Sequence, residues 1–104
     1  MGFEYEAKTK LDDGQAKELI ERLVAHRGWT VVERGARRVS FRFAGTPAPR
    51  PGEFDDEFAV ELQPGGETYL RFHGATHAQE AEVKKVIAAA MKGLGVIGVK
   101  FEEL

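Results

Sequence analysis

The chain contains no cysteine, which excludes disulfide bonds, thiolate metal sites and thiol nucleophiles. Small secreted domains often depend on disulfides, so their absence favours a reducing cytoplasm. Residues 1–6 have neither the basic nor the apolar segment of a secretory signal. Long hydrophobic runs are also lacking, and none approaches the roughly 18 residues that a membrane-spanning helix needs. We therefore expect a cytoplasmic protein with no membrane partner.

A large excess of charge of either sign is absent as well. The 15 lysines and arginines are balanced by 17 aspartates and glutamates, which leaves a formal net charge of −2. Capture of nucleic acid or anionic lipid depends on a strongly positive surface, so this balance disfavours nucleic acid as a partner. At 104 residues the chain is expected to form a single domain, residues 1–104, around one core.

Two amphipathic segments, Asp12 to Arg27 and Thr76 to Lys92, have the apolar spacing of helices. In the first, the apolar stripe comprises Ala16, Leu19, Ile20, Leu23 and Val24. Both segments begin with the spacing of a capping box, in the pairs Asp12–Gln15 and Thr76–Gln79. The sequence therefore predicts two helices, each with one buried face.

Strand-like segments occupy most of the remaining chain. They alternate apolar with polar residues or are rich in β-forming residues, and they span 3–8, 29–34, 37–43, 57–62, 68–73 and 96–103. Residues 44–56 hold all but one of the chain's four prolines, so we expect a surface loop there. The predicted order of elements is strand, helix, four strands, helix, strand.

This order predicts an α+β fold with a single antiparallel sheet of about six strands. With strands numbered along the chain, the order 6-1-5-4-3-2 makes all neighbours antiparallel and places both helices on one face. The topology is similar to one half of the TATA-binding-protein fold, whose sheet grips DNA. The predicted outer face instead interleaves acidic residues with basic ones, namely Glu4, Glu6, Glu57, Glu61 and Glu102 with Lys8, Arg38, Arg42, Arg71 and Lys100. The resemblance therefore concerns fold and not DNA binding.

The strongest candidate for polar chemistry is the segment from His73 to His77. One imidazole at a strand end and another at a helix start would converge, and Glu80 follows one turn later. Two histidines and a carboxylate suit zinc or iron, so His73, His77 and Glu80 are candidate metal ligands. Their spacing matches no recognised ligand signature, and surface histidines beside a tight turn are the alternative. The sequence places no nucleophile beside them, so we assign no catalytic residue and no cofactor.

The second predicted hairpin concentrates positive charge in Arg34, Arg37, Arg38 and Arg42. Arginines in such a group clamp phosphate or carboxylate ligands. The neighbouring strand carries Glu57 and Glu61. Cross-strand pairing with these glutamates explains Arg38 and Arg42 without any ligand. The acidic run at the end of the 44–56 loop, Glu53 and 55–57, similarly suits either a bound cation or a solvated surface.

The interpretation that we favour is a small, non-catalytic, bacterial-type cytoplasmic interaction or adaptor module. Its surface would be the outer sheet face or the two predicted sheet edges, 29–34 and 96–101, because edges must be covered or paired. A partner strand or a second copy in a homodimer would pair with them. The expected interaction residues are Arg38, Arg42, Glu57, Glu61 and Arg71. The alternative is a small-molecule or metal-binding protein or enzyme, with a site between the 44–56 loop and the His73–His77 turn.

Overall fold

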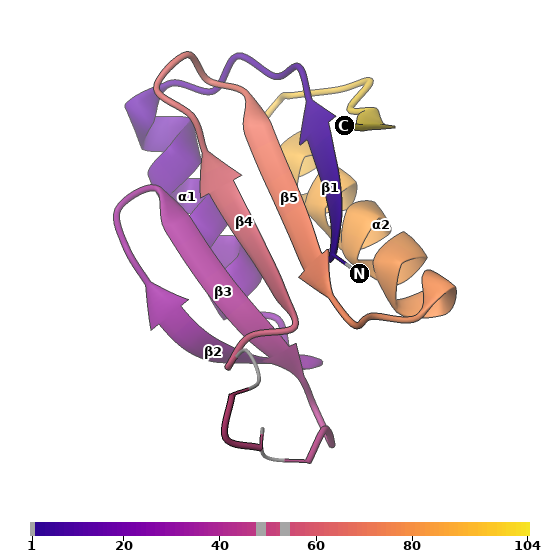
Figure 1. The fold of residues 1–104 in the computed structure, drawn as a ribbon. Helices are drawn as coiled ribbons and strands as arrows, with labels where there is room; N and C mark the ends of the chain where they lie inside the picture. The colour runs from indigo at the N-terminus through magenta and orange to yellow at the C-terminus, as the bar shows by residue number, and fades with distance from the viewer. Residues whose placement is uncertain (1, 48–49, 53–54) are drawn as a thin grey trace.

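The computed structural model describes residues 2–47, 50–52 and 55–104. Both helices lie behind one six-stranded sheet (Figure 1). The elements are β1 Gly2–Ala7, α1 Asp13–Val24, β2 Trp29–Arg34, β3 Arg38–Phe43, β4 Phe58–Leu62, β5 Thr68–His73, α2 His77–Gly93 and β6 Phe101–Glu103. The predicted α+β fold and order of elements are confirmed.

The strands lie in the order β2-β3-β4-β5-β1-β6, and all neighbouring pairs are antiparallel. This is the predicted order. β1 occupies the place between β5 and β6, with Tyr5 opposite Leu70 on one side and opposite Glu103 on the other. β2 and β6 are consequently the two edges of the sheet.

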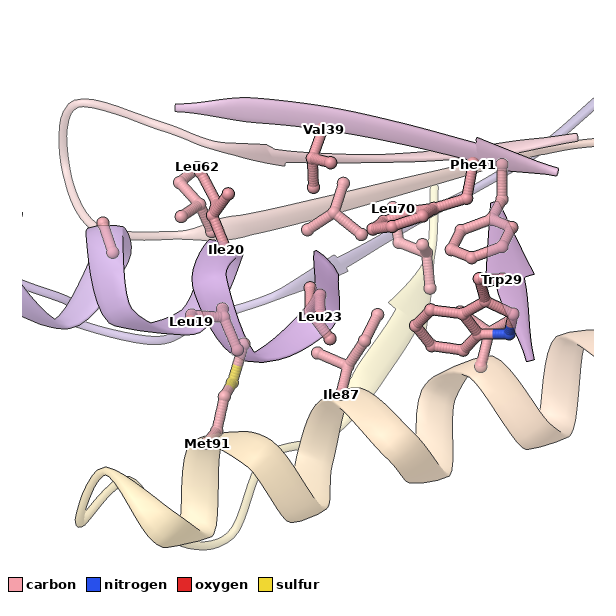
Figure 2. Packing of buried hydrophobic residues seen from close by; sticks show 14 of the residues in the cluster. Leu19, Ile20, Leu23, Trp29, Val39, Phe41, Leu62, Leu70, Ile87 and Met91 are labelled. Carbon is pink, nitrogen blue, oxygen red and sulfur yellow. The ribbon is translucent and has the colours of Figure 1, made fainter. Parts of the chain in front are cut away.

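The core lies between the sheet and the two helices. Figure 2 shows side chains of both helices directed toward the same face of the sheet, with Ile20 and Leu23 from α1 and Ile87 and Met91 from α2. The sheet contributes fully buried residues at alternating positions, namely Val39, Phe41, Phe58, Val60, Leu62, Leu70 and Phe72. Burial of this apolar surface is the main stabilising contribution to the fold.

The capping boxes set the start of each helix as predicted. The Gln15 amide donates to Oδ1 of Asp12 at 2.7 Å, and the Asp12 amide donates to Oε1 of Gln15 at 3.0 Å. The same reciprocal pair joins Thr76 and Gln79. Each pair satisfies backbone amides that the first turn leaves without helical partners. α1 ends at Val24, before the predicted end at Arg27.

The last strand is shorter than predicted. Strand geometry was expected over residues 96–103 but is found only over Phe101–Glu103. Gly95 and Gly98 have φ angles of +86° and +70°, and these left-handed conformations interrupt extended backbone. The expected second edge at 96–101 was therefore wrong for residues 96–100, which form a loop.

The predicted loop at 44–56 contains no helix or strand in its described residues, 44–47, 50–52 and 55–56. Residues 48–49 and 53–54, which include Glu53 of the acidic run, lie outside the described residues. Over the part of the chain that the structure describes, no helix is both long and apolar enough to cross a membrane.

Candidate functional site

On the outer face of the sheet, the side chain of Asp56 connects two strands. Its Oδ1 atom lies 3.0 Å from Nδ1 of His73 on β5, and its Oδ2 atom lies 3.6 Å from Nη2 of Arg38 on β3. Only 12% of the Asp56 side chain and 15% of the His73 side chain are exposed. These contacts fasten the end of the 44–56 loop to the sheet.

The structure does not bring the three candidate metal ligands together. β5 alternates its side chains, so His73 lies on the outer face while Phe72 is buried on the helix side. Glu80 is on the buried side of α2, where it accepts a hydrogen bond of 2.9 Å from the Tyr5 hydroxyl. His77 is exposed in the first turn of α2. Among the described residues, no group of three or more histidines, aspartates and glutamates is arranged to hold a metal ion. The expected ligand site beside the 44–56 loop stays a prediction.

The five expected interaction residues are brought onto one face. In register, Arg38 lies opposite Glu61, and Ala59 lies opposite both Ser40 and Arg71. Arg42 lies near the end of β3 and Glu57 directly precedes β4, both next to the 44–56 loop. All five are partly buried rather than freely exposed.

The ion pairs expected between the two arginines of β3, Arg38 and Arg42, and the glutamates Glu57 and Glu61 do not form. Arg38 instead interacts with Asp56, and its Nη1 atom lies 3.9 Å from Oε2 of Glu33. Arg42 donates hydrogen bonds to the backbone carbonyls of Thr46 and Pro47 in the loop. The carboxylate of Glu57 accepts a hydrogen bond of 3.0 Å from the backbone amide of Phe43. Arg38 and Arg42 thus interact with the 44–56 loop rather than with these two glutamates.

The middle of the outer face is less solvated than the sequence predicts. Ser40 is 1% exposed and Ala59 is 5% exposed. To reach Asp56, the Arg38 side chain crosses the row that holds these two small residues, which shields them in the manner of long amphipathic side chains. The Ser40 hydroxyl and the Nε atom of Arg71 are buried, and neither has a hydrogen-bond partner in the part of the chain that the structure describes.

A cleft of about 490 Å³ lies between α1 and the turn from β2 to β3. Its lining comprises Asp13, Ala16, Lys17 and Ile20 of α1, Arg34 at the end of β2 and residues 35–37 of the turn. We call it the α1 cleft. Sequence reasoning grouped two of its arginines, Arg34 and Arg37, but missed Lys17 and the cleft itself.

Three cationic side chains face one anionic side chain in the α1 cleft. Arg37 donates to the Asp13 carboxylate and to the Gln63 carbonyl, so its charge is already paired. Lys17 and Arg34 are exposed, and neither has an ion-pair partner among the described residues. The cleft therefore has unpaired positive charge available to a ligand.

A β-bulge in β2 directs Arg34 toward the α1 cleft. Val31 lies opposite Phe41, but the next pairs are Glu33 with Ser40 and Arg34 with Val39, so Val32 is the extra residue. Val39 is fully buried on the helix side, and its partner Arg34 shares that side. Strict alternation from Val31 would have placed Glu33 there. The bulge thus substitutes a cation for an anion beside α1.

The free edge of β2 continues from this cleft. β2 is six residues long, and β3 is its only partner among the strands of residues 2–47, 50–52 and 55–104. Thr30 and residues 32–34 are exposed, including 37% of Val32. The opposite edge strand, β6, has three residues, and within the described residues it pairs with β1 alone.

Comparison of the chain with protein-family models, with curated proteins and with solved structures finds no match.

Proposed function

We propose that this protein is a small, non-catalytic interaction module that binds an extended segment of a partner protein along the free edge of β2. The observation that carries the proposal is the unpaired side of β2, which at six residues is the longer of the two edge strands. Backbone amides and carbonyls on such an edge form a ladder with an added strand. The alternate side chains of that strand supply specificity.

β2 suits this role better than β6 because of its length and backbone geometry. β6 offers three residues, and the chain before it is diverted at Gly95 and Gly98. β2 offers six residues, and its last residue, Arg34, lines the α1 cleft. A partner strand on β2 would therefore have both a ladder and a cleft to contact.

The polar groups that would be candidates for chemistry support a binding role rather than a catalytic one. Asp56 interacts with His73 and Arg38, and Glu80 accepts a hydrogen bond from Tyr5. These contacts maintain the loop and the packing of α2. A binding module needs no further reactive group.

A partner strand fits the β2 edge better than a second copy of the chain. A bulge and charged side chains are devices by which proteins prevent edge-to-edge pairing of identical sheets. β2 has both, in the bulge at Val32 and in Glu33 and Arg34. We therefore expect a monomer in solution, which light scattering after size exclusion measures directly.

Peptide display followed by NMR tests the proposal. We expect selected peptides to be extended and to shift and protect amides of Trp29–Arg34. Analogues N-methylated at alternate backbone nitrogens should lose binding, because they cannot form a ladder. Analogues methylated at the opposite nitrogens are the matched control. Selected peptides that map to another surface, or a dimer joined through β2, would refute the proposal.

A further inference from the structure

We infer that the partner segment carries a carboxylate that binds in the α1 cleft, so that the module selects acidic extended peptides. This inference rests on the proposed function and adds the chemistry of the partner. The occupant is a peptide whose backbone pairs with β2 and whose carboxylate reaches Lys17 and Arg34.

The edge of β2 ends at the α1 cleft. Arg34 is the last residue of β2 and also lines the α1 cleft. Residues 35–37 form the turn into β3 and line the same cleft. A strand added to β2 therefore reaches the cleft at one end of its ladder. Figure 1 shows the β2–β3 turn beside α1 at this side of the molecule.

The charged side chains of the α1 cleft favour an anionic ligand. Arg37 already binds the Asp13 carboxylate and the Gln63 carbonyl. Lys17 and Arg34 have no ion-pair partner among the described residues. They converge on the cleft from a helix and from a strand. A single carboxylate between them would complete two ion pairs, and an uncharged side chain would complete neither.

The floor of the α1 cleft is apolar. Ala16 and Ile20 are each 2% exposed and line the cleft from α1. An ion pair formed above an apolar floor is less screened by water than one on an open surface. The methylene groups of an aspartate or glutamate would pack on the same floor. The volume of about 490 Å³ exceeds that of any one side chain, so a free C-terminal carboxylate also fits.

The bulge in β2 determines which charged side chain faces the partner strand on the side of α1. With regular alternation, Glu33 would lie beside α1 and would repel a carboxylate. The bulge at Val32 places Arg34 there and leaves Glu33 on the outer face, where it lies 3.9 Å from Arg38. An inward charge on an edge disfavours apolar strands. A strand with an opposite charge at that position is the class that the edge still accepts.

The test uses the intact protein and short peptides of alternating threonine and valine. One peptide ends in glutamate with an amidated C-terminus, one ends in glutamine with a free carboxylate, and one ends in amidated glutamine. Calorimetry gives the affinities. We expect at least one of the two carboxylate peptides to bind about tenfold more tightly than the neutral peptide, and their ranking identifies the source of the carboxylate.

Charge-reversed variants locate the carboxylate. Lys17→Glu changes an exposed helix position, and Arg34→Glu changes an exposed strand end. Each should remove most of the preference for the acidic peptide, about tenfold. Lys85→Glu makes the same charge change at an exposed site on α2 outside the cleft and should leave the preference unchanged. Circular dichroism confirms the fold of each variant, and Lys17→Glu decides the result if Arg34→Glu does not fold.

The outcomes separate the two proposals. Equal binding of acidic and neutral peptides, with amide shifts still confined to β2, would overturn the carboxylate inference and leave edge pairing intact. Acidic binding that depends on Lys17 but tolerates N-methylated peptides would support the cleft and refute edge pairing. A single-stranded oligonucleotide that binds as tightly as the acidic peptide, with the same loss in Lys17→Glu, would overturn the assignment to a peptide. Absence of binding by all three peptides would refute both proposals.

Discussion

The Tyr5 hydroxyl donates a hydrogen bond of 2.9 Å to Oε1 of Glu80, and this bond joins β1 to α2. Glu80 is 4% exposed, although it belongs to a residue type that is seldom buried. The Nζ atom of Lys84 lies 3.5 Å from the centre of the Tyr5 ring. The tyrosine thus satisfies a buried carboxylate and contacts a cation of the same helix.

Replacement of Tyr5 by phenylalanine should destabilise the fold. The variant keeps the ring but leaves the Glu80 carboxylate without this donor, and a loss of about 1–3 kcal/mol in unfolding free energy is typical of such a change. Tyr69→Phe is the matched control, because Tyr69 lies on the outer face and Glu4, to which its hydroxyl is bonded, is exposed to water. Urea denaturation should show a larger loss for Tyr5→Phe. Equal losses would contradict a specific role for the Tyr5–Glu80 bond.

The hydrogen bond between Tyr5 and Glu80 also makes the stability of the fold depend on pH in the alkaline range. Burial, followed by the hydrogen bond to Glu80 and the charge of Glu80, raises the pKa of Tyr5 from 10.0 to about 12. The folded pKa is above the unfolded value, so this contribution is complete below pH 10.0 and is lost as pH rises through about 12. Denaturation midpoints over this window should fall less steeply in Tyr5→Phe than in the parent.

The pH measurement is clearest in a Tyr69→Phe background. Burial and a hydrogen bond to Glu4 also raise the pKa of Tyr69, so its ionisation would overlap with that of Tyr5. The chain has two tyrosines, and the ultraviolet absorbance of tyrosinate in this variant reports Tyr5 alone. If Tyr5 ionises with a pKa close to 10.0, the folded environment does not disfavour the tyrosinate.

Local signals in the sequence were sufficient for most of the fold. The pairs Asp12–Gln15 and Thr76–Gln79 predicted both helix starts, because a capping box involves residues three apart. Alternation predicted the central strands, and antiparallel pairing then gave the strand order. The last strand failed because the glycines before it adopt left-handed conformations, which their presence alone does not reveal.

The candidate site depends on contacts that the sequence does not encode locally. The bulge at Val32 occurs without a glycine or proline in β2, so nothing in the sequence indicated that Arg34 faces α1. Lys17 and Arg34 meet only because α1 packs beside the β2–β3 turn. The Asp56–His73 contact likewise requires the path of a long loop. Residues far apart in sequence become a site only once the packing is known.

Gly66 should tolerate no side chain. Its φ angle is +94°, and a Cβ atom there would lie 2.8 Å from the backbone nitrogen of Leu11, whose amide donates to the Gly66 carbonyl. Gly66→Ala should therefore lower the unfolding free energy by about 1–3 kcal/mol, measured by urea denaturation. In the control Gly65→Ala, the closest atoms belong to the flexible Glu67 side chain, so a much smaller loss is expected. Similar losses in both variants would refute this account.

Ser40 should be replaceable by alanine without loss of stability. It is 1% exposed, and its hydroxyl has no hydrogen-bond partner among the described residues, so the folded state bears the cost of removing that hydroxyl from water. We expect Ser40→Ala to leave the unfolding free energy unchanged or to raise it by about 1 kcal/mol. The contrasting variant is Thr68→Val, because the Thr68 hydroxyl is buried but lies 3.0 Å from the hydroxyl of Thr9. That change should cost about 1 kcal/mol in urea denaturation. A clear loss in Ser40→Ala would indicate that its hydroxyl is hydrogen-bonded in solution and that the centre of the outer face admits water.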